Sequence, residues 1–180
     1  YLAQVEASYV KRVIEILEPL GHEVIVHFEL QGETISGRLR SHAVLPAPGD
    51  PIVLPAQSRE VHYEGELAIV IGRLCRDVPA ERVHEAILGY TCANDVTARD
   101  LQRSDGQWWR AKGFDTFCPL GPYLVTGLDL AQAGDLALTT RLDGEVVEQT
   151  RTAQMVFDIT RLVTHRSAAM TLLPGDVILT

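Results

Sequence analysis

Two glutamates, Glu64 and Glu66, stand two positions apart at the start of an apolar run that ends at Gly72. The run is rich in Leu, Ile and Val, which predicts a strand over residues 62–71. Side chains alternate between the two faces of a strand, so both glutamates are expected on one face. Neighbouring carboxylates repel each other and lose hydration when they are buried. The pattern therefore favours a cation between them.

A third carboxylate, Asp95, follows a second apolar stretch at residues 90–93, which is expected to be a buried strand. A loop at the end of that strand can turn Asp95 toward a neighbouring strand. Three carboxylates without a nearby His or Cys favour a hard cation rather than zinc: Mg²⁺, Mn²⁺ or Ca²⁺. Such an ion keeps coordination positions for water or substrate, which is typical of a catalytic site.

The spacing of Glu64 and Glu66 also has a second interpretation. Glu-x-Glu is common in strands, and the two side chains could pair with arginines or lie on a solvated edge of a sheet. The spacing alone leaves both interpretations open.

Composition narrows the class of protein. The chain has 180 residues, 46% hydrophobic and 22% charged, which suits one globular domain with a core. Its net charge of −8 argues against nucleic acid and anionic membrane as partners. No apolar run is long enough to span a bilayer, and no signal peptide is evident. Cys75, Cys92 and Cys118 lack CxxC spacing, so reduced thiols of a cytoplasmic protein are expected.

The remaining pattern predicts a β-rich α+β fold with short helices. Strands are expected at residues 24–30, 52–54, 136–142 and 177–179, with a hairpin turn at Asp143-Gly144. Helices are expected at residues 6–18 and from Thr152 onward. In the second helix one face would be apolar, made of Met155, Val156, Ile159, Leu162 and Val163. Residues 104–117 are expected to form a long polar loop.

Four ordered blocks of sequence resemble the fumarylacetoacetate hydrolase family. They cover residues 62–67, 89–102, 110–122 and 170–180. The resemblance extends over about residues 48–180 and implies a catalytic domain with the mixed β-roll of that family, usually in a homodimer. Residues 1–47 form an N-terminal segment whose fit to the family is not established by these blocks.

The resemblance also implies a metal centre. Positions matching Glu64, Glu66 and Asp95 hold a divalent cation in the family, usually Mg²⁺ or Mn²⁺. Positions matching Gln102 and Lys112 contact the oxygens of a small-molecule substrate, a 2-oxo or β-diketo acid. The carboxylate and adjacent carbonyl of such an acid can chelate the metal, which stabilises an enolate.

Two further residues are candidates for substrate contact. Arg99 lies one helical turn past Asp95, where it either reaches the site or pairs with Asp95 or Asp100. Thr180 matches a position that contacts substrate, although the family continues there with Gly-Thr-Pro. The catalytic domain is therefore expected to be truncated at its C-terminus.

The N-terminal segment departs from the family pattern. It lacks the stretch Asn-Tyr-x-x-His-x-x-Glu, whose His and Glu activate water in the hydrolytic members, and it also lacks Phe-x-Lys-Pro. The leading hypothesis is a metal-dependent hydrolase that cleaves a C–C bond, such as an acylpyruvate hydrolase. The departure raises a second hypothesis, an isomerase or decarboxylase acting on a 2-hydroxyhepta-2,4-diene-1,7-dioate-like diacid. A third is a catalytically silent, metal-stabilised dimerisation module.

Overall fold

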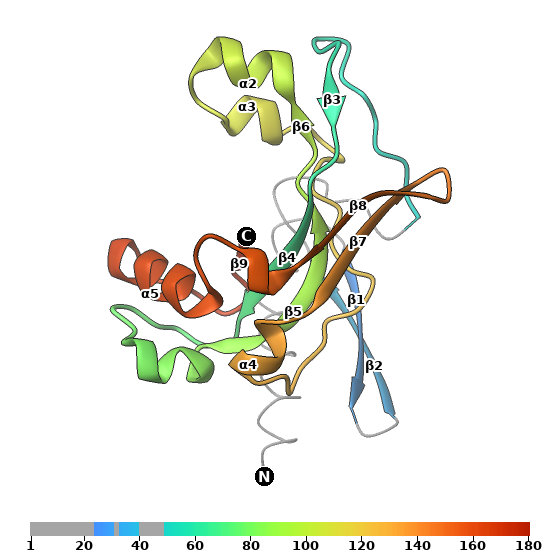
Figure 1. Ribbon diagram of the computed structural model, residues 1–180. Coiled ribbons are helices and arrows are strands. Elements are labelled where there is room, and N and C mark those ends of the chain that lie inside the picture. The colour runs from blue at the N-terminus through green and yellow to red at the C-terminus, as the bar shows by residue number, and fades with distance from the viewer. Residues whose placement is uncertain (1–23, 31–32, 40–48) are drawn as a thin grey trace. The chain divides into compact units, whose positions relative to one another are not determined.

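The computed structural model describes residues 24–30, 33–39 and 49–180 (Figure 1). These residues divide between two compact units. Unit 1 takes the chain up to Glu64 together with Ala93–Leu124, and unit 2 takes Gly65–Cys92 together with Val125–Thr180. Each unit is thus assembled from segments that are distant in the sequence. The helix expected over residues 6–18 lies outside the described residues.

The described part of unit 1 contains two pairs of antiparallel strands. The first pair is β1 (Val24–Leu30) and β2 (Glu33–Leu39), which confirms the strand expected at residues 24–30. The second joins β3 (Val61–His62) to β6 (Thr97–Ala98). The short helix α2 (Arg99–Asp105) follows β6 directly, and a second short helix, α3 (Trp109–Lys112), follows α2 after a turn.

A small apolar core supports the helices of unit 1. Phe117 is 1% exposed, and its ring meets that of Phe114 edge to face, with the centroids 5.4 Å apart. The other members of this core are Val96 and Ala98, with Ile52, Val61 and Leu101 packed against them. Because Leu101 belongs to α2, its side chain packs that helix against this core.

Unit 2 is built on a three-stranded sheet in the order β5–β4–β9. Its members are β5 (Ile87–Asn94), β4 (Gly65–Ile71) and β9 (Val177–Leu179), and β9 runs antiparallel to β4. Residues 67–71 of the central strand are all buried. Burial on both faces explains why this segment is continuously apolar instead of alternating. The strand expected at residues 177–179 is confirmed.

Short helices cover the apolar residues of unit 2. They are η2 (Ala80–Glu85), α4 (Leu130–Ala133), η3 (Thr152–Gln154) and α5 (Ile159–Ala169). Val83 of η2 and Val163 of α5 are fully buried in the same core as Ile69 and Ile71. The side chain of Asp158 begins α5 by accepting a hydrogen bond of 2.7 Å from the backbone N–H of Arg161.

The hairpin expected around Asp143-Gly144 is confirmed. Strand β7 (Ala137–Leu142) pairs with β8 (Glu145–Arg151), and both turn residues have positive φ, 51° and 86°. This is the conformation of a tight type I′ hairpin turn, in which Asp-Gly is a preferred pair.

Four expectations about the elements are wrong in detail. Residues 52–54 form no strand, and the loop expected over 104–117 contains α3. The strand expected over 62–71 is interrupted at Tyr63 and Glu64, between β3 and β4. The helix expected from Thr152 is confirmed from Ile159 onward, as α5, but it starts later than expected, because Thr152–Gln154 form the separate turn η3 and Met155 is extended. Val156 is consequently 89% exposed.

No helix among the described residues has both the length and the apolar character that crossing a bilayer requires.

The core of unit 1 gives a prediction about stability. Phe117→Ala should lower the free energy of unfolding by about 3–5 kcal/mol, because it removes a buried ring and leaves a cavity. Val156→Ala is the control and should change it by less than about 0.5 kcal/mol, since that side chain is exposed. Urea denaturation followed by circular dichroism measures both. Equal losses in the two variants would contradict this packing.

Candidate metal centre

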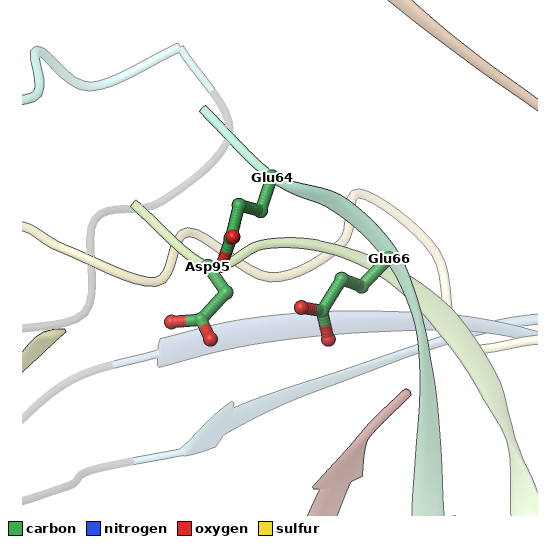
Figure 2. Close-up of side chains that lie close together, drawn as sticks. All are labelled: Glu64, Glu66 and Asp95. Atoms are coloured by element: carbon green, nitrogen blue, oxygen red, sulfur yellow. The ribbon is translucent and has the colours of Figure 1, made fainter. Parts of the chain in front are cut away.

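Three carboxylates converge at the strand ends, as Figure 2 shows. Glu64, Glu66 and Asp95 each offer one carboxylate oxygen, and these oxygens lie within 4.8 Å of one another. Glu66 is in β4, Glu64 lies just before that strand, and Asp95 directly follows β5. Asp95 is only 9% exposed. The structure therefore brings together the three residues that the sequence predicts as metal ligands.

Backbone hydrogen bonds hold Glu64 and Asp95 side by side. The N–H of Asp95 donates to the carbonyl oxygen of Glu64 at 2.9 Å. The N–H of Glu64 donates to the side-chain oxygen of Asn94, also at 2.9 Å. Two hydrogen bonds thus join the backbone at Glu64 to the segment 94–95, which lies about thirty residues further along the chain.

The hydroxyl of Thr97 adds a further link. Thr97 is fully buried, and its Oγ1 lies 2.8 Å from the carbonyl oxygen of Asp95 and 3.1 Å from a carboxylate oxygen of Glu64. Neither Thr97 nor Asn94 was predicted from the sequence as a residue of the site. The signal that could have drawn attention to them is their place in the block 89–102, beside Asp95.

Two cationic side chains contact these carboxylates. The Nζ of Lys112 donates to Glu64 Oε2 at 2.7 Å and also to Asp95 Oδ2. The guanidinium of Arg99 pairs with the other carboxylate oxygen of Glu64. The interpretation that the glutamates pair with arginine therefore holds for Glu64, alongside the interpretation as a metal ligand.

The donor set fits a hard divalent cation. Carboxylate oxygens are the ligands that Mg²⁺, Mn²⁺ and Ca²⁺ prefer, and three of them converge here. The ammonium of Lys112 already bridges Glu64 and Asp95. A positive charge is thus accommodated between these two carboxylates.

The ion pairs at the centre shift the pKa values of Glu64 and Lys112. Burial alone raises the pKa of Glu64, but hydrogen bonds from Lys112 and Arg99 outweigh it and hold that pKa below its ordinary value. Burial likewise lowers the pKa of Lys112, whereas its bonds to Asp95 and Glu64 raise it, with a net rise. Glu64 is therefore ionised, and Lys112 protonated, at neutral pH.

Arg99 also determines which atoms Gln102 can present to a ligand. Its guanidinium donates from Nη1 to Oε1 of Gln102 at 2.9 Å. A guanidinium has donors only, so the amide must turn its oxygen toward Arg99. The NH₂ group of Gln102 then remains as a donor for an acceptor such as a carboxylate or enolate oxygen.

The structure separates the open alternatives for Arg99. The side chain of Arg99 lies at the centre, where it contacts Glu64 and Gln102, whereas Asp100 accepts hydrogen bonds from Ser58 and from the N–H of Arg59.

Thr180 comes directly after β9, the strand that pairs with β4. The role of Thr180 in contacting substrate stays a prediction.

The residue between the two glutamates, Gly65, has no room for a side chain because Thr140 lies close to it. A Cβ added at Gly65 would lie 2.2 Å from Oγ1 of Thr140 on β7. That hydroxyl is itself held by a 3.0 Å hydrogen bond to Glu148 of β8. The need for glycine at position 65 was not predicted from the sequence.

We predict that Gly65→Ala both destabilises the protein and weakens metal binding. The added methyl group must displace Thr140 or the strand, at a cost of about 1–3 kcal/mol, and the shift moves the flanking Glu64 and Glu66. Thermal unfolding and Mn²⁺ titration calorimetry measure the two effects. Gly144→Ala is unsuitable as a control because its φ is positive, so Ala131→Ser at an exposed position of α4 serves instead and should change both quantities little.

The lowered pKa of Glu64 predicts a pH dependence of stability in metal-free protein. A carboxyl group whose pKa is depressed by folding stabilises the fold above its unfolded pKa, 4.5 here, and that contribution is lost as the pH falls through the folded value. The difference in Tm between wild type and Glu64→Gln should therefore shrink from about pH 6 to about pH 3.5. A difference that grows on acidification would contradict this account.

Known proteins resemble this chain in sequence and in fold. The family described as Fumarylacetoacetate (FAA) hydrolase C-terminal matches residues 31–180. Protein Rv2993c of Mycobacterium tuberculosis is 56% identical over 142 residues, which are 79% of this chain and 54% of that protein. The mitochondrial oxaloacetate tautomerase Fahd2a of Rattus norvegicus is 46% identical over 134 residues, 74% of this chain and 43% of that protein.

A solved structure extends the likeness to the fold. The crystal structure of 2-hydroxyhepta-2,4-diene-1,7-dioate isomerase from Mycobacterium marinum is 48% identical, with a TM-score of 0.72, and the match covers 88% of this chain and 62% of that one. The chain spans about half the length of the curated relatives it matches. The α+β fold expected from the resemblance is thereby confirmed. The chain belongs to the fumarylacetoacetate hydrolase family.

Proposed function

We propose that this chain provides the metal centre of a divalent-metal-dependent enzyme that stabilises the enolate of a 2-oxo acid, in an isomerisation, tautomerisation or decarboxylation. The observation that carries the proposal is the convergence of Glu64, Glu66 and Asp95 beside the donors Lys112 and Gln102. The oxygens suit Mg²⁺ or Mn²⁺, and the donors suit an anionic substrate.

A bound divalent cation would polarise the carbonyl of the substrate and stabilise the negative charge that develops on its oxygen. The side chains have complementary roles. Lys112, whose pKa is raised, keeps its proton and can donate a hydrogen bond to a carboxylate or enolate oxygen next to Glu64 and Asp95. Gln102 can orient the substrate through its NH₂ group, because Arg99 occupies its oxygen.

The names of two relatives favour proton transfer as the reaction at this site, whereas decarboxylation is proposed from the chemistry of the metal enolate alone. One is called an oxaloacetate tautomerase and another a hydroxyheptadienedioate isomerase. Both names describe reactions of 2-oxo acids or their enols. Hydrolysis of a C–C bond is the second candidate, because the matching family is described as a hydrolase. The homodimer and the cytoplasmic location stay predictions.

We expect Glu66→Gln to abolish binding of Mn²⁺ and turnover together, because an amide is a weaker ligand than a carboxylate for a hard cation. Glu145→Gln, in the exposed strand β8, is the matched control and should leave both unchanged. Titration calorimetry measures the binding. A Glu66→Gln variant that binds Mn²⁺ normally and stays active would refute the metal centre.

Product analysis separates the candidate reactions. With Mg²⁺ present, the protein should interconvert the keto and enol forms of oxaloacetate, shift a double bond in a 2-hydroxydienedioate, or release CO₂ from a 2-oxo diacid. Mass spectrometry distinguishes these from hydrolysis of an acylpyruvate, which yields two fragments. The silent dimerisation module predicts a Tm raised by Mg²⁺ without any turnover.

A further inference from the structure

Three of the side chains expected to contact a substrate are carried by one helical hairpin, residues 99–112. Arg99 and Gln102 lie on α2, and Lys112 is the last residue of α3. The three expected metal ligands lie outside this hairpin, at the strand ends. The distance between Gln102 and Lys112 therefore depends on how α2 and α3 are held together.

An ion pair closes the hairpin at its turn. Asp105 is the last residue of α2, and Arg110 is the second of α3. The guanidinium of Arg110 donates from Nε to Asp105 Oδ2 and from Nη2 to Oδ1, both at 2.6 Å. The hydroxyl of Ser104 adds a contact of 2.9 Å to the same carboxylate. This two-point geometry fixes direction as well as distance.

The helices need such a clamp because they are short. Helices of seven and four residues have little stability of their own. Helix α2 is held to the segment 58–60 through Asp100 with Ser58 in its first turn and through Arg103 with Glu60 in its last turn. On α3, Ala111 is fully buried, and it is a small side chain. Among the contacts described between the two helices, the pair of Asp105 and Arg110 joins them by side chains.

We propose that Asp105 and Arg110 are positioning residues that set the spacing between Gln102 and Lys112 and so determine how well the centre binds an anionic 2-oxo acid. The inference rests on the proposed function. Neither residue contacts the expected metal ligands in the described contacts, and both act through the hairpin. Metal binding should therefore be independent of the pair, whereas ligand binding depends on it.

The test is a double-mutant cycle with Asp105→Asn, Arg110→Gln and the double variant. Oxalate, a planar 2-oxo acid mimic, is titrated in the presence of saturating Mn²⁺, and Mn²⁺ is titrated alone. Each single variant should bind oxalate about three- to fivefold more weakly, the range expected for a well-formed exposed ion pair. The double variant should lose no more than either single one, because all three lack the same pair.

A matched control comes from unit 2. Arg151 and Asp135 form a similar exposed pair, with Nε and Oδ1 2.6 Å apart. Asp135→Asn should leave oxalate affinity unchanged. Mn²⁺ affinity should not fall in any of these variants, since their substitutions leave Glu64, Glu66 and Asp95 in place.

Three results would overturn the proposal: unchanged oxalate affinity in the single variants, additive losses in the double variant, or a parallel fall in Mn²⁺ and oxalate affinity. The last would indicate general structural damage rather than positioning. If the wild type binds Mn²⁺ but not oxalate, the proposed function fails, and the positioning role fails with it. Oxalate binding that is indifferent to the pair leaves the proposed function intact.

Discussion

Repulsion among closely held carboxylates is the constraint on which the centre depends. The backbone bond between Asp95 and Glu64 and the bond from Glu64 to Asn94 hold two of the acids next to each other. Such an arrangement is costly without positive charge nearby. Lys112 and Arg99 supply part of that charge, and the oxygens of the three acids are arranged to accept more from a divalent cation.

Two tasks of the site fall to different elements. The first task, holding the carboxylates, falls to the strand ends, and the second, placing the donors for a ligand, falls to the helical hairpin. Strand ends, whose backbone is fixed by hydrogen bonds to neighbouring segments, carry the carboxylates. The helical hairpin carries the donors, which have to match the shape of a ligand. Gly65 shows how tightly the first task is built, because a single methyl group would collide with Thr140. Asp105 and Arg110 show that the second task relies on surface contacts.

Much of the centre could be predicted from sequence, but for different reasons. Spacing on an apolar strand was enough to pair Glu64 with Glu66, whereas Gln102 and Lys112 came only from the family resemblance. The turn at Asp143-Gly144 was predictable because its chemistry is local. The partners Asn94 and Thr97 were not, since their contacts depend on segments about thirty residues away. The helix expected from Thr152 begins seven residues later, at Ile159, because the side chain of Asp158 caps it there, and apolar spacing does not reveal that cap.

The central claim is that Glu64, Glu66 and Asp95 together hold a divalent cation. Anomalous diffraction from crystals soaked in Mn²⁺ and oxalate tests it most directly. We expect an anomalous peak that marks a Mn²⁺ ion bound by one oxygen of each of the three carboxylates. Oxalate should lie beside this ion, within hydrogen-bonding distance of Lys112 and Gln102. Crystals that contain Mn²⁺ elsewhere but show no peak there, with Lys112 still bridging Glu64 and Asp95, would contradict it.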